Sequence, residues 1–135
     1  MSKAPLTGFH HASVTVTDLD RSVAWYESVF DLTELFDEHG DGRRAKVYRI
    51  NGTHTMLGLV EHSTTGDDRF RPDRVGLDHL AFAVAERGHV DEWAIALDAA
   101  DVDHSGPIEL PVGAILNFHD PDGVQLSIFW EGVVS

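Results

Sequence analysis

Hydrophobic and polar residues alternate along two short stretches of the chain, residues 10–17 and 79–84. A period of two residues is typical of a β-strand, whose side chains point to opposite faces in turn. In the first stretch Val14 and Val16 therefore share one face, and His11 lies on the other. We expect each stretch to open a structural unit, because a helical pattern follows both.

The helical pattern has a period close to 3.6 residues. Val23, Tyr26 and Phe30 recur at positions i, i+3 and i+7, which places their side chains on one face of a helix. Aspartates at positions 18 and 20 each offer an N-cap for this helix, which we expect to end near residue 31. The second helix is marked by Val90, Trp93, Ala94 and Leu97.

Further strands follow each helix. In the first half, residues 46–50 and 55–61 are predicted strands on either side of Asn51-Gly52, a dipeptide typical of hairpin turns. One more short strand is expected within residues 35–48, and residues 37–44 are interpreted as a charged surface loop. In the second half, two predicted strands, 115–118 and 124–130, flank the turn Asp120-Pro-Asp-Gly123.

The two halves match each other at an offset of 68 residues, which becomes 69 in the last strand. The aligned pairs are His11 with His79, Trp25 with Trp93, Ile50 with Phe118, and Gly58 with Ser127. Such an ordered series indicates a duplicated unit. We therefore predict a single α+β domain over residues 1–135, built of two tandem βαβββ modules. The modules cover residues 9–62 and 77–131, and residues 63–76 form a polar linker.

Each predicted module covers one sheet face with its own helix and leaves the other face open. We expect the two open faces to line the cup of a curved mixed sheet, where a ligand would bind. The formal net charge of −13 disfavours nucleic acid as a partner. The absence of a long apolar run argues against a membrane span and a signal peptide, so we expect a cytoplasmic protein. With no cysteine, a metal would need histidine, carboxylate or water.

Three segments carry a resemblance to a known family: residues 11–26, residues 76–84, and Asp120-Pro-Asp-Gly123. In this order they resemble the vicinal-oxygen-chelate superfamily, which contains glyoxalases, bleomycin resistance proteins and dioxygenases. The resemblance implies a glyoxalase-like fold, a small-molecule ligand and a homodimer. It leaves the reaction open, because the family includes lyases, isomerases, dioxygenases and non-catalytic drug-binding proteins.

In metal-dependent members of that family, four equivalent strand positions hold a divalent ion. Here these positions are His11, Gly58, His79 and Ser127, so the resemblance implies two histidine ligands and two positions that lack metal-binding side chains. Strand alternation places Gln125 and Phe129 on the same face as Ser127. We expect Gly58, Gln125, Ser127 and Phe129 to contact the ligand.

Three functions remain open at this point. In the first, His11 and His79 hold Zn, Ni, Mn or Fe, and the protein is a metal-dependent lyase, isomerase or dioxygenase. The alternative is a metal-free protein that binds or sequesters a small molecule, as in drug resistance. The third is a metal-independent enzyme in which one of these histidines acts as acid or base.

Overall fold

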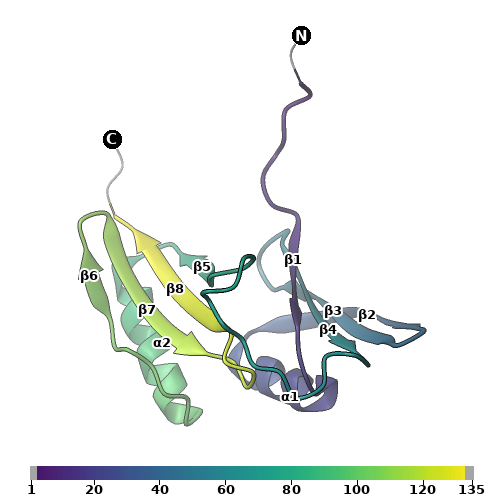
Figure 1. Cartoon of the computed structure of the whole chain (residues 1–135). Helices are drawn as coiled ribbons and strands as arrows, with labels where there is room; N and C mark the ends of the chain where they lie inside the picture. Colours follow the sequence, from purple (N-terminus) through teal and green to yellow (C-terminus); the bar gives the residue numbers. More distant parts are fainter. Residues whose placement is uncertain (1–2, 133–135) are drawn as a thin grey trace. The chain divides into compact units, whose positions relative to one another are not determined.

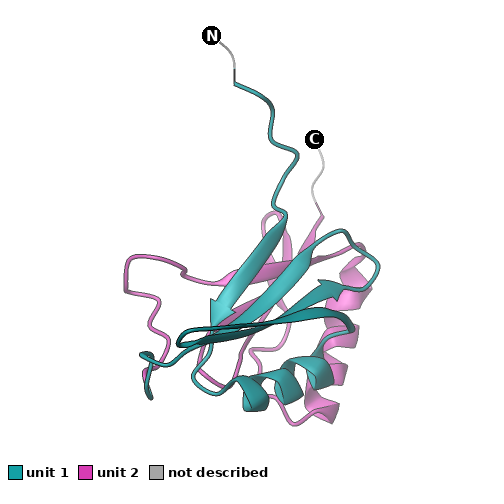
Figure 2. Ribbon diagram, turned by 90° about the vertical axis from the view of Figure 1, so that its right-hand side faces the viewer, with its two compact units in different colours: residues 1–67 teal, residues 68–135 magenta. Residues whose placement is uncertain are grey.

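The computed structural model describes residues 3–132. The chain divides into two compact units, Met1–Asp67 and Asp68–Ser135 (Figure 2). Within the described residues, each unit contains one helix and one four-stranded sheet (Figure 1). This confirms the predicted α+β fold of two βαβββ modules. No helix in residues 3–132 is long and apolar enough to cross a membrane.

The first unit has strand order β1-β4-β3-β2, with β1 parallel to β4 and the other neighbours antiparallel. Its helix contacts β3 and β4. Buried side chains of alternate strand residues, such as Val14, Leu57 and Leu59, form the core beside the helix. The elements are β1 (His11–Thr15), α1 (Leu19–Val29), β2 (Leu32–Gly40), β3 (Arg43–Ile50) and β4 (Met56–His62).

The second unit repeats this topology, with strand order β5-β8-β7-β6 and β5 parallel to β8. Its helix contacts β5, β7 and β8, and its core includes the buried residues Leu97, Leu116 and Ile128. The elements are β5 (Leu80–Val84), α2 (Arg87–Ala99), β6 (Ile108–Leu110), β7 (Gly113–His119) and β8 (Gln125–Glu131).

Strand β2 differs from the prediction, because it has nine residues and includes the first half of the expected charged loop, residues 37–40. The interpretation of residues 37–44 as a loop is therefore wrong: they form the end of β2, a tight turn and the start of β3. Cross-strand ion pairs explain the difference. Lys46 lies 3.0 Å from Glu34 and 3.5 Å from Asp37, and Arg43 pairs with Glu38. Opposite charges on neighbouring strands support pairing without any hydrophobic alternation.

The predicted turn at residues 120–123 is present and is closed by an aspartate side chain. The Asp120 carboxylate accepts hydrogen bonds from the backbone N–H groups of Asp122 at 2.9 Å and Val124 at 2.8 Å. Gly123 has a φ of 86°, a conformation that favours glycine. The N–H of Phe70 donates to the carbonyl oxygen of Asp122 at 3.1 Å. Part of the predicted linker is thereby attached to the β7–β8 turn of its own unit.

His104 closes the loop that follows α2. Its Nε2 lies 2.7 Å from Asp98, and its Nδ1 lies 2.9 Å from the N–H of Gly106. Because a carboxylate accepts and a backbone N–H donates, Nε2 carries the proton and Nδ1 is the acceptor in the neutral ring. The ring therefore ties the loop to the last turns of the helix.

Candidate ligand-binding and metal sites

The face of the second sheet that points away from α2 carries alternate residues of three strands; we call it the open face. The shared orientation predicted for Gln125, Ser127 and Phe129 is found on β8. Strand pairing adds further residues to this face. They could not be predicted from the sequence, because the pattern within one strand does not show which residues of the next strand lie opposite. The open face consists of Ala81, Ala83, Ile115, Asn117, His119, Gln125, Ser127 and Phe129.

Ser127 does not present a free hydroxyl on this face. Its side chain is fully buried, and its Oγ–H donates to Oδ1 of Asn117 at 2.7 Å. Asn117 is the cross-strand partner of Ser127 on β7. Because Oδ1 of the half-buried Asn117 accepts this bond, its Nδ2 amino group is the part of the amide that can donate to other partners.

The open face changes polarity along the strands. The pair Asn117 and Ser127 lies in its middle, and the next pair toward the β7–β8 turn is His119 and Gln125. In the other direction the next pair is apolar, Ile115 with the half-buried Phe129. This arrangement suits a ligand with an apolar or aromatic part and a hydrogen-bonding part.

His79 directly precedes β5 and has a carboxylate beside it. Its Nδ1 lies 2.8 Å from Oδ1 of Asp78, and its side chain is 44% exposed. A carboxylate only accepts, so Nδ1 carries the proton and Nε2 presents its lone pair outward. A histidine held in this way suits either a metal ion or a ligand hydroxyl.

In the first unit, Gly58 lies beside Ser13, its register partner on β1. A Cβ atom at position 58 would stand 2.5 Å from Oγ and 3.3 Å from Cβ of Ser13. A side chain at this position would therefore require the Ser13 hydroxyl to rotate away and Ser13 to shift slightly. As a glycine, position 58 itself offers no side chain that could bind a metal.

His11 opens β1 and meets the ring of its neighbour His10. The two Nδ1 atoms are 2.9 Å apart, and the rings pack edge to face with centroids 5.1 Å apart. Strand alternation does not place His10, because it holds only inside a strand and β1 begins at His11.

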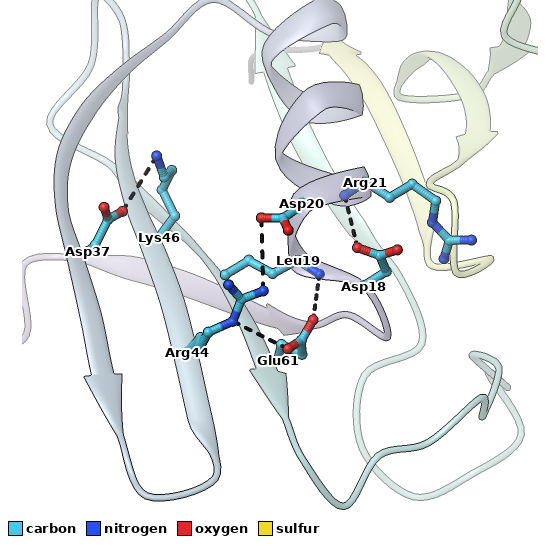
Figure 3. A network of polar contacts seen from close by, with 8 residues as sticks. All are labelled: Asp18, Leu19, Asp20, Arg21, Asp37, Arg44, Lys46 and Glu61. Atoms are coloured by element: carbon cyan, nitrogen blue, oxygen red, sulfur yellow. Dashed lines mark hydrogen bonds and ion pairs between the residues drawn. The ribbon is translucent and has the colours of Figure 1, made fainter.

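The helix side of the first sheet carries a polar network rather than a ligand set (Figure 3). Glu61 lies on this side: its Oε2 accepts from the N–H of Leu19 at 2.8 Å, at the start of α1. Its Oε1 lies 3.4 Å from Nε of Arg44. Asp18 is the N-cap and accepts from the N–H of Arg21 at 3.1 Å. Glu61 therefore stabilises the helix N-terminus and does not replace Gly58.

A second polar group joins α1 to β2 and β3. The hydrogen bond that Glu34 accepts from Lys46 holds the pKa of the Glu34 carboxylate below its usual range. The pKa of Glu27 is raised by partial burial and by the neighbouring Glu34. Burial, followed by the charges of Glu27 and Glu34, raises the pKa of the Tyr48 hydroxyl. The Tyr48 side chain is fully buried, and the Glu27 carboxylate lies close enough to interact with its hydroxyl.

The four predicted metal positions do not fit a divalent centre of the expected type. A catalytic zinc site normally has three protein ligands, and a non-heme iron site has two histidines and a carboxylate. Of the four positions only His11 and His79 have ligand side chains. Position 58 is a glycine and has no side chain to offer, and the Ser127 hydroxyl is engaged with Asn117.

Residues 8–128 match the model of the Glyoxalase/Bleomycin resistance protein/Dioxygenase superfamily. The chain belongs to this superfamily. A glyoxylase/bleomycin resistance protein/dioxygenase domain from Frankia sp. is 35% identical, with coverage of 95% of this chain and 100% of that one and a TM-score of 0.88. No curated protein matches the chain.

More distant members of the superfamily share the fold. One is a mutant of the fosfomycin resistance protein FosX from Listeria monocytogenes, in complex with Mn(II) and a dihydroxypropylphosphonic acid. It is 19% identical, with a TM-score of 0.68 and coverage of 93% of this chain and 90% of that one. Another is TnmS3, an antibiotic-binding protein from a Streptomyces species. It is 22% identical, with a TM-score of 0.73 and coverage of 96% and 100%.

Proposed function

We propose that this protein binds a small organic molecule on the open face of its second sheet and does not depend on the four-residue metal centre. The observation that carries the proposal is the state of positions 58 and 127. Gly58 has no side chain to bind a metal, and Ser127 is buried and bonded to Asn117.

The open face of the second unit supports a ligand of mixed polarity. Phe129 and Ile115 offer apolar contact, while Asn117 and Gln125 offer amide groups that fix orientation. Small-molecule sites combine mostly apolar walls with a few directed polar groups in this way. An aromatic compound with hydrogen-bonding substituents fits this face better than a small polar anion does.

A thermal-shift screen in the presence of EDTA tests this proposal. The compounds are aromatic antibiotics, including the cationic bleomycin, and fosfomycin as a small, non-aromatic anion for comparison. A ligand at a hundred times its Kd stabilises the native state by about 2.7 kcal/mol, which raises Tm by roughly 10 °C in a chain of this size. We expect such a shift with an aromatic compound and none with fosfomycin.

Matched variants locate the binding face. Phe129→Ala should lower the affinity for the stabilising compound at least tenfold, about 1.4 kcal/mol. Ile95→Ala removes an apolar side chain that is 69% exposed on α2, and should leave the affinity unchanged. Stabilisation that requires added Mn, Ni, Zn or Fe and disappears with EDTA would contradict the proposal and favour a metal-dependent enzyme using His11 and His79.

A homodimer is part of the same proposal, as the family resemblance implies. Light scattering coupled to size-exclusion chromatography measures it directly. A molar mass near twice the 14.9 kDa of one chain is the expected result, and a monomer at micromolar concentration would contradict it.

A further inference from the structure

Asn51, in the turn between β3 and β4, is held against the beginning of β2 by three hydrogen bonds. Its backbone N–H donates to the carbonyl oxygen of Asp31 at 3.0 Å, and its Nδ2 donates to Oδ1 of Asp31 at 2.7 Å. Its Oδ1 accepts from the Thr33 hydroxyl. We call the two side-chain bonds the Asn51 clamp. All three side chains are exposed, so water competes for the clamp and it can open without unfolding the sheet.

The residue after Asn51 is Gly52, which leaves its own backbone nitrogen open to reaction. Gly52 has a φ of 82°, and no atom lies within 4 Å of the point where a Cβ would stand. The backbone nitrogen that follows an asparagine can attack Cγ of its side chain, and a glycine hinders this attack least because it has no Cβ. The attack requires Cγ of Asn51 to swing toward Gly52, away from Asp31 and Thr33.

The turn itself also resists this movement. Both the N–H and the hydroxyl of Thr53 donate to the carbonyl oxygen of Ile50, at 3.1 Å and 2.8 Å. The backbone on either side of the Asn51–Gly52 bond is therefore fixed while the clamp is closed, and the reaction needs both the side chain and the turn to move.

We propose that Asn51 is a deamidation site that the clamp keeps slow in the folded protein. When the clamp opens, the nitrogen of Gly52 bonds to Cγ and the Cγ–Nδ2 bond breaks. The amide group leaves as ammonia and takes the proton of the Gly52 nitrogen, which leaves a five-membered succinimide. Water then opens the ring at either carbonyl and gives aspartate or isoaspartate. One water is consumed, one ammonia is released, and nothing is oxidised or reduced.

The product cannot restore the clamp, because the modified side chain is a carboxylate. A carboxylate only accepts hydrogen bonds, so the bond to Asp31 is lost and two like charges face each other, which destabilises the contact. Deamidation therefore loosens the junction between β2 and the β3–β4 turn permanently. The site lies in the first unit, so this inference stands apart from the proposed function on the open face of the second unit.

Peptide mass spectrometry after incubation at mildly alkaline pH tests the site. The chain has two asparagines, and trypsin places Asn51 in the peptide 50–69, apart from Asn117. We expect deamidation at Asn51 and none at Asn117, which precedes a phenylalanine. Conversion in urea should be about tenfold faster than in the folded chain, because both clamp bonds are lost. Electron-transfer fragmentation separates aspartate from isoaspartate. Absence of conversion at Asn51 even in urea would overturn the site.

Three variants test whether the clamp sets the rate. Thr33→Val removes one clamp bond and keeps a β-branched strand residue, so it should speed conversion about fivefold, the change expected for one lost hydrogen bond. Thr64→Val alters an exposed threonine elsewhere and should leave the rate unchanged. Asp120→Ala weakens the second unit and should also leave it unchanged. Equal rates in folded and unfolded chains, or equal acceleration by Asp120→Ala and Thr33→Val, would overturn the role of the clamp.

Thermal melts followed by circular dichroism test the consequence of modification. Asn51→Asp imitates the aspartate product and should lower Tm by about 4 °C at neutral pH. The same substitution in an Asp31→Asn background should cost almost nothing, because the new amide can donate to the new carboxylate. An unchanged Tm in Asn51→Asp, or an equal loss in both backgrounds, would overturn the proposed opposition with Asp31.

Discussion

Replacing Asp120 with alanine tests how the β7–β8 turn is stabilised. The substitution removes the acceptor for two backbone N–H groups, those of Asp122 and Val124. Asp120 is only 5% exposed, so water reaches the two donors poorly. A buried donor left without a partner costs about 1–3 kcal/mol. We therefore expect Asp120→Ala to lower the free energy of unfolding by about 2–4 kcal/mol, a large part of the 5–15 kcal/mol typical of a native protein.

Urea denaturation followed by circular dichroism measures this loss, and amide hydrogen exchange at Asp122 and Val124 reports whether it arises in the turn. Asp120→Asn keeps a side-chain oxygen acceptor, so it should cost less than half as much. Asp67→Ala removes an exposed aspartate and should change stability by less than about 0.5 kcal/mol. The reasoning is refuted if Asp120→Ala behaves like Asp67→Ala, or if the asparagine variant is as unstable as the alanine variant.

Three smaller changes test other contacts. Glu61→Ala removes the acceptor for the N–H of Leu19 and should cost about 1–2 kcal/mol, seen as a lower Tm, while Glu61→Gln should keep most of the contact. His104→Ala should cost about 1–2 kcal/mol and speed hydrogen exchange at the Gly106 amide. Burial raises the pKa of the Tyr48 hydroxyl above the ordinary tyrosine value of about 10. As the pH rises past this value, Tyr48 ionises in the unfolded chain before it ionises in the folded one, and the folded state loses stability. Tyr48→Phe should leave stability near pH 7 within about 1 kcal/mol and reduce the loss above pH 10; urea midpoints at both pH values check this.

Much of the fold could be predicted from the sequence because it is encoded twice. Alternation at β1 and β5, and helical spacing in α1 and α2, recur at the same offset, so each half supports the interpretation of the other. The sequence predicted one short strand within residues 35–48, but not the full extent of β2, because the stability of β2 comes from contacts with another strand. Glu34 and Asp37 both pair with Lys46, and such pairs carry no periodic signature in either strand. A polar, charged segment without alternation is interpreted as a loop.

The sequence predicted which positions belong to the candidate site, but not which residues lie next to them. Aligning the halves gave His11, Gly58, His79 and Ser127, but it gave no information about their cross-strand partners. Asn117 was missed because its contact with Ser127 depends on the register of the β7–β8 hairpin.

His10 was missed for a different reason. His10 precedes β1, which begins at His11, so strand alternation gives no information about where its ring lies. In the structure the ring lies against His11.

Positions 58 and 127 differ in what a conversion to a metal centre would require of their cross-strand neighbours. Gly58→Glu would place its Cβ 2.5 Å from Oγ of Ser13, so that hydroxyl would have to rotate away, and Ser13→Gly beside it removes the obstacle. Ser127→Glu would place a carboxylate where a hydroxyl now donates to Oδ1 of Asn117, so the Asn117 amide would have to turn and donate from Nδ2 instead. Restoring a ligand at either position therefore depends on how the cross-strand neighbour adjusts.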